Sequence, residues 1–426
     1  MRKNLFLRAA SLVLAASLLA GCGNGGASLA TGDAGTAAET QGSTEAVLNS
    51  AVPAPTDYVS EADMQEADKW PSCDDRALAA VMRKASSGEK VTIACIGGSI
   101  TEGSISGGTK DSEVADRKCY ADIFFEWWKE TFPDTEFDFV NAGIGGTDSY
   151  LGVHRVQSDV LDKNPDLVLV EFSVNDRNSL FYKQSYDNLV RKILRSENRP
   201  AVMLLFMAQP NGNSAQENHV FVGYGYKLPM LSYGNLIRSY MDNGVYTEKE
   251  LSGDEVHPSA LGHAITGEML WKYLNGVYEN CKTMEEPDDF DTAPVMKELY
   301  LDGTVLDSRT ITPDETGTFE LKNTCGYFPY GWKCSAGDGG ITFTAEFKNL
   351  GILYLATTDG AGGQFELYVD GEYVNIMNAD NTGGWGNAIK ADQMYTSGER
   401  AKHTVTIKKS ADSQGDVFDL LGLLTS

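Results

Sequence analysis

The sequence predicts an α/β domain, with a parallel sheet covered by helices on both faces, followed by an all-β sandwich domain. In the first two thirds of the chain, short runs of apolar and β-branched residues alternate with segments of helical periodicity. This alternation is typical of a parallel sheet buried between helices. In the last third, apolar and polar residues alternate with a period of two, and no helical pattern of useful length appears.

Four segments of the first part are predicted to be buried strands because they are short and mostly apolar. Two segments between them place apolar residues on one side of a helix, and Asn164-Pro165 ends the second. The predicted strands are 91–96, 137–140, 167–172 and 201–207, and the predicted helices are 120–131 and 153–161. Ligand sites of such sheets lie beyond the carboxyl ends of the strands.

The last third contains three segments with strand periodicity, 341–347, 365–369 and 403–407. Asp370-Gly371 follows the second of these and is a favoured two-residue hairpin turn. Short strands separated by turns predict a β-sandwich.

Composition divides the chain further. Residues 22–68 are rich in Gly, Ala, Ser and Thr, which predicts a flexible tether. An acidic segment containing Pro287 predicts a linker at 283–292. We therefore expect an α/β domain at 69–282 and a β-sandwich accessory domain at 293–426.

The N-terminus has the features of an export signal. Arg2, Lys3 and Arg8 precede or flank the start of an apolar run of about a dozen residues, which is too short to span a bilayer as a mature helix. The run ends in Leu19-Ala20-Gly21-Cys22, which resembles a bacterial lipobox. The resemblance implies a signal peptide at 1–21 and a lipidated Cys22. We expect an exported protein, anchored by lipid to the outer face of the bacterial cell membrane. The alternatives are an ordinary signal peptide and a short anchor.

Charge and cysteine content narrow the range of partners. The net charge of −25, without a Lys/Arg stripe, argues against a nucleic-acid partner and favours a neutral small molecule or polysaccharide. No CxxC pattern or Cys/His cluster indicates a metal site, and we expect no metal or organic cofactor.

Cys95 is predicted to be a buried free thiol, whereas Cys325 and Cys334 are close enough in sequence to form a disulfide.

Ser99 is a candidate nucleophile because it follows the first predicted strand directly, after Gly97 and Gly98. A serine at this edge can expose its hydroxyl and present its backbone N–H to a substrate oxygen. The alternative is a helix N-cap serine in a glycine-rich turn. The segment taken alone does not decide between them.

A serine nucleophile needs a base, and the chain has five histidines. His257 follows Asp254 by three residues, so a tight turn brings a carboxylate to its imidazole, as a catalytic triad requires. The alternative is a surface turn that caps the helix from Ala260 onward. Of the other four, His219 and His263 have no carboxylate at a suitable spacing, His403 lies in a predicted β-domain strand, and His154 is a weak candidate at a helix start.

Two further strand ends offer donors for an oxyanion hole. Gly146 follows the second strand and lets a backbone N–H approach a ligand closely. Asn175 follows the third strand and offers a side-chain amide. Each of these segments, taken alone, favours a simple turn, and it is their occurrence together that points to a site.

The four segments, in this order and rough spacing, resemble the four conserved blocks of the SGNH (GDSL-like) hydrolases over about residues 90–275. The resemblance implies a flavodoxin-like sheet and a serine esterase, with Ser99 as nucleophile, His257 as base and Asp254 orienting it. It further implies an oxyanion hole of the Ser99 and Gly146 N–H groups with the Asn175 amide. The sequence departs from the name-giving motif at Gly98, where that motif has Asp. The resulting GGSI block is more similar to carbohydrate-directed esterases than to lipases.

The β domain and the polar region between 175 and 254 favour an acetylated polysaccharide or oligosaccharide as substrate. Trp332 and Trp385 are candidate sugar-contacting residues, and core or loop packing is the alternative for both. Two other functions stay open: a lipolytic or aryl-ester hydrolase with the same triad, and a glycan-binding surface lipoprotein without catalysis.

Overall fold

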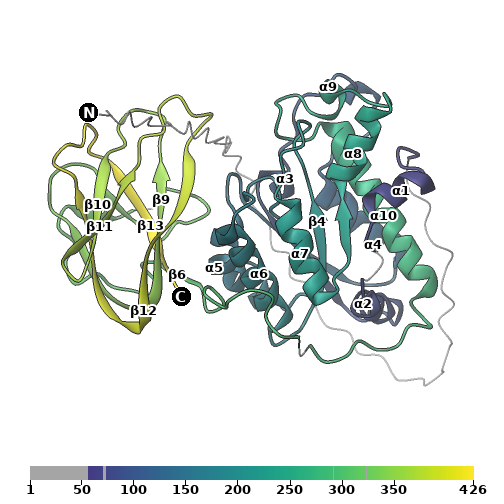
Figure 1. The fold of residues 1–426 in the computed structure, drawn as a ribbon, viewed down its shortest axis with the longest axis horizontal. Coiled ribbons are helices and arrows are strands. Elements are labelled where there is room, and N and C mark those ends of the chain that lie inside the picture. Colours follow the sequence, from purple (N-terminus) through teal and green to yellow (C-terminus); the bar gives the residue numbers. More distant parts are fainter. Residues whose placement is uncertain (1–55, 71–72, 291, 323) are drawn as a thin grey trace, which may run out of the picture.

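The computed structural model describes residues 56–70, 73–290, 292–322 and 324–426. Figure 1 shows an α/β unit, coloured purple to green, beside a β unit coloured green to yellow. The predicted order, a helix-covered parallel sheet followed by an all-β domain, is confirmed. The predicted signal peptide and Cys22 lie outside the described residues. Within the described ranges, no helix is long and apolar enough to cross a membrane.

The first sheet has five parallel strands in the order β2-β1-β3-β4-β5. They are β1 (Val91–Gly97), β2 (Phe137–Gly143), β3 (Leu167–Glu171), β4 (Ala201–Phe206) and β5 (Met230–Ser232). Strands β1, β3 and β4 are buried along their whole length, whereas the edge strand β2 is half exposed and carries Asp138 and Asn141. The chain changes direction across the sheet between β1 and β3, where a crevice suited to a ligand forms in such folds.

Ten α-helices and two short 3₁₀ segments occur in the described part of the α/β unit. They are α1 (Glu61–Ala67), α2 (Arg76–Ser86), α3 (Ser99–Glu102), α4 (Tyr120–Thr131), α5 (Ser149–Asp159), α6 (Leu180–Leu194), α7 (Gln216–Tyr226), α8 (Tyr233–Asp242), α9 (Glu248–Leu251) and α10 (Ala260–Asn280), with 3₁₀ turns at Asp111–Glu113 and Leu161–Lys163.

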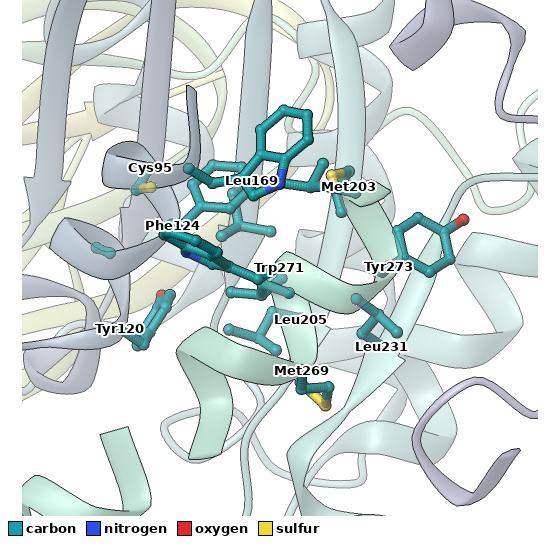
Figure 2. Packing of buried hydrophobic residues seen from close by; sticks show 14 of the residues in the cluster. Cys95, Tyr120, Phe124, Leu169, Met203, Leu205, Leu231, Met269, Trp271 and Tyr273 are labelled. Carbon is teal, nitrogen blue, oxygen red and sulfur yellow. The ribbon is translucent and has the colours of Figure 1, made fainter. Parts of the chain in front are cut away.

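Successive strand residues point to opposite faces of the sheet, and each face has its own core. Ile93 and Cys95 of β1 pack toward α2, α4, α8 and α10, whereas Ala94 and Ile96 pack toward α5, α6 and α7. Figure 2 shows part of the first core, in which strand residues such as Leu169 lie among side chains of α4 and α10. Two buried faces explain why the strand segments are apolar throughout.

The predicted tether at 22–68 is wrong for residues 56–68, which pack on the hydrolase domain. Helix α1 lies against α8 and α10, and Val59 and Ala67 are fully buried. The buried carboxylate of Glu268 accepts hydrogen bonds from the Tyr58 and Val59 N–H groups, at 2.9 and 3.1 Å. The segment has few apolar residues, so its composition does not predict packing. The hydrogen bonds that hold it come from a residue 209 positions away in sequence.

The acidic segment predicted as a linker runs along the surface of the α/β unit. Glu286 and Asp288 pair with Arg83 and Arg76, at 2.8 and 2.7 Å. The linker acids are largely exposed, so each such pair stabilises the fold only weakly. These pairs fix the path of the chain toward the second domain.

The β domain is one antiparallel sheet in the order β11-β10-β12-β9-β13-β8-β7, with β6 paired to β13. Its strands are β6 (Thr304–Leu306), β7 (Phe319–Leu321), β8 (Trp332–Cys334), β9 (Ile341–Ala356), β10 (Gln364–Val369), β11 (Glu372–Asn378), β12 (Ala388–Lys409) and β13 (Phe418–Thr425). Val369 pairs with Glu372 across the predicted two-residue turn, where Asp370 and Gly371 both have positive φ.

The two domains share a core that β9 and β13 build. The first half of β9 alternates buried with more exposed residues, whereas its second half is buried throughout. Ile352 and Tyr354 face the inside of the β domain, while Leu353 and Leu355 join a cluster with helix α5. Strand β13 alternates in the same way. The β domain is therefore packed against the α/β unit through buried apolar side chains.

None of the six cysteines within the described residues forms a disulfide. Cys95 is fully buried, as the sequence predicts. Cys325 and Cys334 do not form the disulfide that their spacing allows. Cys334 is buried in the β-domain core, whereas Cys325 packs against the cluster between the domains.

Candidate active site

Ser99 begins helix α3 at the carboxyl end of β1. Gly98 occupies the N-cap position of that helix, so the N-cap alternative for Ser99 does not apply. A Cβ on Gly97 would lie 2.0 Å from the Thr101 hydroxyl, so a glycine is needed where the strand enters the helix. As the first helical residue, Ser99 has an N–H that the helix itself does not use.

His257 and Asp254 lie in one turn after α9. The Asp254 Oδ1 atom accepts hydrogen bonds from the N–H groups of Val256 and His257, at 3.0 and 2.7 Å. Its Oδ2 atom is 2.6 Å from His257 Nδ1, and His257 Nε2 is 3.0 Å from the Ser99 hydroxyl. The structure thus brings together three side chains that 158 residues of sequence separate.

The alternative role for this turn, a cap on the following helix, belongs to another residue. Ser259 is the N-cap of α10, and its side chain accepts a hydrogen bond from the Gly262 N–H. Asp254 and His257 are therefore free to bond each other. The Ser106 hydroxyl donates to the His257 carbonyl at 2.6 Å, which fixes the turn beside the serine.

Asp254 is held in its charged form. Partial burial raises the pKa of its carboxyl, but the hydrogen bonds from His257 and Val256 outweigh burial and keep the pKa below its ordinary value of 3.8. An ionised Asp254 fixes the proton on His257 Nδ1 and leaves Nε2 to accept the proton of Ser99.

Asn175 lies directly beside the serine turn. A Cβ on Gly98 would lie only 2.2 Å from the Asn175 side-chain oxygen, so this carboxamide fills the space that a side chain at position 98 would need. No hydrogen bond engages the Asn175 amide within the described residues. It is therefore a free donor at the sheet edge where Ser99 lies.

The glycine loop after β2 also reaches the serine. A Cβ on Gly145 would lie 3.8 Å from the Ser99 Cβ, whereas Gly146, the residue predicted from the sequence, has a φ of 70° and open space around it. Both peptide N–H groups thus belong to a loop that contacts the nucleophile. Gly145 was not singled out from the sequence, because consecutive glycines give no pattern that distinguishes them.

The Ser99, His257 and Asp254 side chains have the geometry of a hydrolytic triad. The model of the GDSL-like lipase/acylhydrolase family matches residues 95–265. A two-domain esterase active on acetylated mannans is 31% identical, with a TM-score of 0.76, over 85% of this chain and 98% of that one. The chain belongs to the GDSL-like lipase/acylhydrolase family.

A second structure of such a two-domain esterase, co-crystallised with mannopentaose, gives 31% identity and a TM-score of 0.75, over 85% of this chain and 97% of that one. None of the curated proteins matches the chain. The similarity extends over most of the length and so includes both domains. Family membership makes the protein a carboxylic ester hydrolase.

Two buried groups that the sequence did not reveal support the loops of this GDSL-like site. Arg155 of α5 donates to the Gly97 carbonyl at 3.0 Å and to the Ala142 carbonyl at 2.8 Å, and so joins the ends of β1 and β2. Asp176, next to Asn175, accepts from the Ser149 N–H and lies 2.9 Å from His219 Nε2.

His219 therefore has a carboxylate partner, contrary to the expectation from sequence spacing. Asp176 is 43 residues away, and only the fold brings the two together. The His219 ring is fully buried and stacks on Tyr186 at 3.5 Å, and burial lowers its pKa to about 3. A neutral imidazole so far inside the protein supports the Asn175 turn and does not serve as the catalytic base.

Glu171 gives this family member a buried acid beneath the serine turn. Its carboxyl accepts from the Ser173 N–H and hydroxyl, at 3.0 and 3.1 Å. Burial raises its pKa from 4.5 to about 7, against the opposing effect of these hydrogen bonds. Between these two pKa values the folded protein keeps a proton that the unfolded chain releases, so rising pH favours unfolding.

We expect Glu171→Gln to remove this pH dependence. Relative to the wild type, the variant should gain stability as the pH rises from about 4.5 to 7, by up to about 1.4 kcal/mol per pH unit. Thermal unfolding of both proteins from pH 4.5 to 8 measures the difference. A constant difference in melting temperature across this range would contradict a neutral Glu171.

The β domain reaches the active-site helix. The Tyr327 hydroxyl donates to the carboxylate of Glu102, three residues after Ser99. The structure corrects the expectation for Trp332, which is 2% exposed and packs on Phe343 in the β-domain core. Trp385 is 43% exposed in its loop, and its sugar contact stays a prediction.

Within the described residues, no three His, Cys, Asp or Glu side chains are grouped to hold a metal ion. The chemistry available from these residues is acyl transfer: a hydroxyl, a base hydrogen-bonded to it, an ionised carboxylate and N–H donors from neighbouring strand ends.

Proposed function

We propose that the protein is an extracellular carbohydrate esterase that removes O-acetyl groups from a mannan-type polysaccharide. The hydrogen-bonded series from Ser99 Oγ to His257 Nε2 and from His257 Nδ1 to Asp254, at 3.0 and 2.6 Å, carries the catalytic part of the proposal. Similarity over both domains to an esterase active on acetylated mannans supports the substrate class.

In the first half-reaction, the Ser99 hydroxyl attacks the acetyl carbonyl carbon while His257 Nε2 takes its proton. Negative charge grows on the carbonyl oxygen, where the Ser99 and Gly146 N–H groups and the Asn175 amide stabilise it. His257 then protonates the sugar oxygen as it leaves, and Asp254 stabilises the imidazolium.

In the second half-reaction, His257 removes a proton from water, which attacks the acetyl-serine ester. Collapse of the second tetrahedral intermediate returns the proton to Ser99 and releases acetate. Each proton passes through His257 Nε2, so these residues and water account for both half-reactions.

Hydrolysis of a panel of esters tests the substrate class. We expect acetate release from acetylated mannan, and a rate on p-nitrophenyl esters that falls steeply from acetate to octanoate. A preference for long acyl chains with no release from acetylated mannan would favour the lipolytic alternative. Absence of hydrolysis of any ester would favour a glycan-binding lipoprotein.

We further propose that Cys22 anchors the protein to the outer face of the bacterial cell membrane. The support is the sequence Leu19-Ala20-Gly21-Cys22 after an apolar run with a positive start. In the producing bacterium, Cys22→Ala should move the protein from the membrane fraction to the soluble fraction. Retention of the variant in membranes would contradict a lipid anchor.

A further inference from the structure

A polar groove lies at the carboxyl ends of β4 and β5. It consists of two adjoining cavities of about 310 and 230 Å³, which share Gly212, Gly234 and Arg238. The loop after β4 forms one wall, and one face of α8 along its length forms the other. The strands of this sheet are parallel, so the carboxyl ends of β4 and β5 lie at the same edge as the carboxyl end of β1, where Ser99 is. The groove therefore opens at the same edge of the sheet as the catalytic residues.

The groove is continuous with the turn that carries the proposed oxyanion donor. Asn178, three residues after Asn175, lines the smaller cavity, and its amide donates to the Ser214 carbonyl at 3.1 Å. The Ala215 N–H donates to the Ser173 carbonyl at 2.6 Å. These bonds fix the groove wall to the end of β3. A ligand in the groove would therefore be held at a fixed position relative to the active site.

Hydrogen bonds within the lining hold its carboxamides in place without a ligand. The Gln216 amide donates to Asn235 at 3.0 Å, and its carbonyl oxygen accepts from the Ser232 hydroxyl at 2.5 Å. Asn211 donates to Gln209 at 3.2 Å. A polar surface fixed in advance loses little conformational entropy when it binds a ligand rich in hydroxyls.

Arg238 is the cation of this groove and is exposed in both cavities. Its guanidinium makes no ion pair or side-chain hydrogen bond with another described residue, although the chain has 60 acidic side chains against 35 basic. Glu217 and Asp242 line the same cavities and disfavour an anionic ligand. The five N–H donors of Arg238 thus remain for neutral oxygen acceptors.

We propose that this groove is a distal subsite that binds a second sugar residue of the polysaccharide chain, with Arg238 donating to its ring hydroxyl or acetyl oxygens. The proposal rests on the proposed function and deepens it. The loop after β4 and helix α8 would set the preference for longer oligosaccharides over shorter ones. The ligand is a neutral glycan unit, distinct from the unit whose ester Ser99 attacks.

Kinetics with Arg238→Ala tests the subsite. The probes are acetylated manno-oligosaccharides of two to six units and p-nitrophenyl acetate. We expect the ratio of kcat/KM for the hexamer to kcat/KM for p-nitrophenyl acetate to fall about 10-fold, because a charged hydrogen bond is lost. This loss should appear as a higher KM for the hexamer, with kcat little changed. Arg400→Ala, an exposed arginine of β12, is the matched control and should leave the ratio unchanged.

Binding of unacetylated mannohexaose, measured by calorimetry on folded protein, separates this proposal from the proposed function. Weaker binding by Arg238→Ala than by wild type supports the subsite whether or not the ester chemistry is correct. Equal binding by the two proteins, or no binding by either, overturns it. Loss of acetylmannan hydrolysis with binding intact would count against the proposed function alone.

Discussion

Ser99→Ala is expected to lower kcat for p-nitrophenyl acetate by about 10⁴-fold or more. The Ser99 hydroxyl is the group that takes the acetyl from the substrate in the proposed reaction, and His257 Nε2 lies 3.0 Å from it. The Ser99 side chain does not cap helix α3, so stability should change little. Steady-state hydrolysis at enzyme concentrations high enough to see residual rates measures the effect.

Ser86→Ala is a suitable control, because that hydroxyl bonds only to the Met82 carbonyl within α2. It should retain wild-type activity. If Ser99→Ala kept more than a tenth of the wild-type rate while folded, the assignment of the nucleophile would be wrong.

The second large effect concerns Asn175 and the glycine beside it. Asn175→Ala is expected to lower kcat by about 10²–10³-fold with little change in KM, because the amide acts where charge develops. Gly98→Ala should reproduce much of this loss. Its new Cβ would lie 2.2 Å from the Asn175 side-chain oxygen and must displace the carboxamide.

The double variant Gly98→Ala/Asn175→Ala tests whether Gly98→Ala acts by displacing the Asn175 carboxamide or by disturbing the active site in another way. If Gly98→Ala acts by moving Asn175, the double variant should be no worse than Asn175→Ala alone. Gly276→Ala serves as the control, since a Cβ there meets nothing within 4 Å. Full additivity of the two losses would show that position 98 acts by another route.

Gly98 also explains a departure in the sequence. The motif that gives the family its name has Asp at this position, and the structure shows why this chain cannot carry it. The Asn175 carboxamide occupies the space of the side chain. The sequence alone suggested a difference in substrate, whereas the contact favours a role for position 98 in placing Asn175, the proposed oxyanion donor.

Several elements could be predicted closely from local pattern. The helix Tyr120–Thr131 has the predicted bounds, and the buried strand from Val91 extends one residue further than expected. Helix α5 begins at Ser149, four residues before the predicted start, because Asp148 caps it through the Leu151 N–H. The three-residue strand β5 was missed, since so short a segment has no measurable period.

Other features depend on partners far away in sequence. Arg155 is 1% exposed and bonds to two strand ends, but nothing in its neighbours distinguishes it from a surface arginine of an amphipathic helix. Trp332 lies in an aromatic-rich segment that resembles a sugar platform, yet it faces the β-domain core. Burial of this kind follows from which sheet face a residue occupies, and short strands do not fix that face.

The sequence by itself determined the order of the elements and the chemical types at four strand ends or turns, because periodicity, turn residues and motif spacing are local properties. Only the tertiary structure decided that Ser99, His257 and Asp254 lie within hydrogen-bonding distance, that Asp176 pairs with His219, and that residues 56–68 are anchored. These outcomes depend on contacts between segments up to about 200 residues apart, and parallel strand order sets which of them meet.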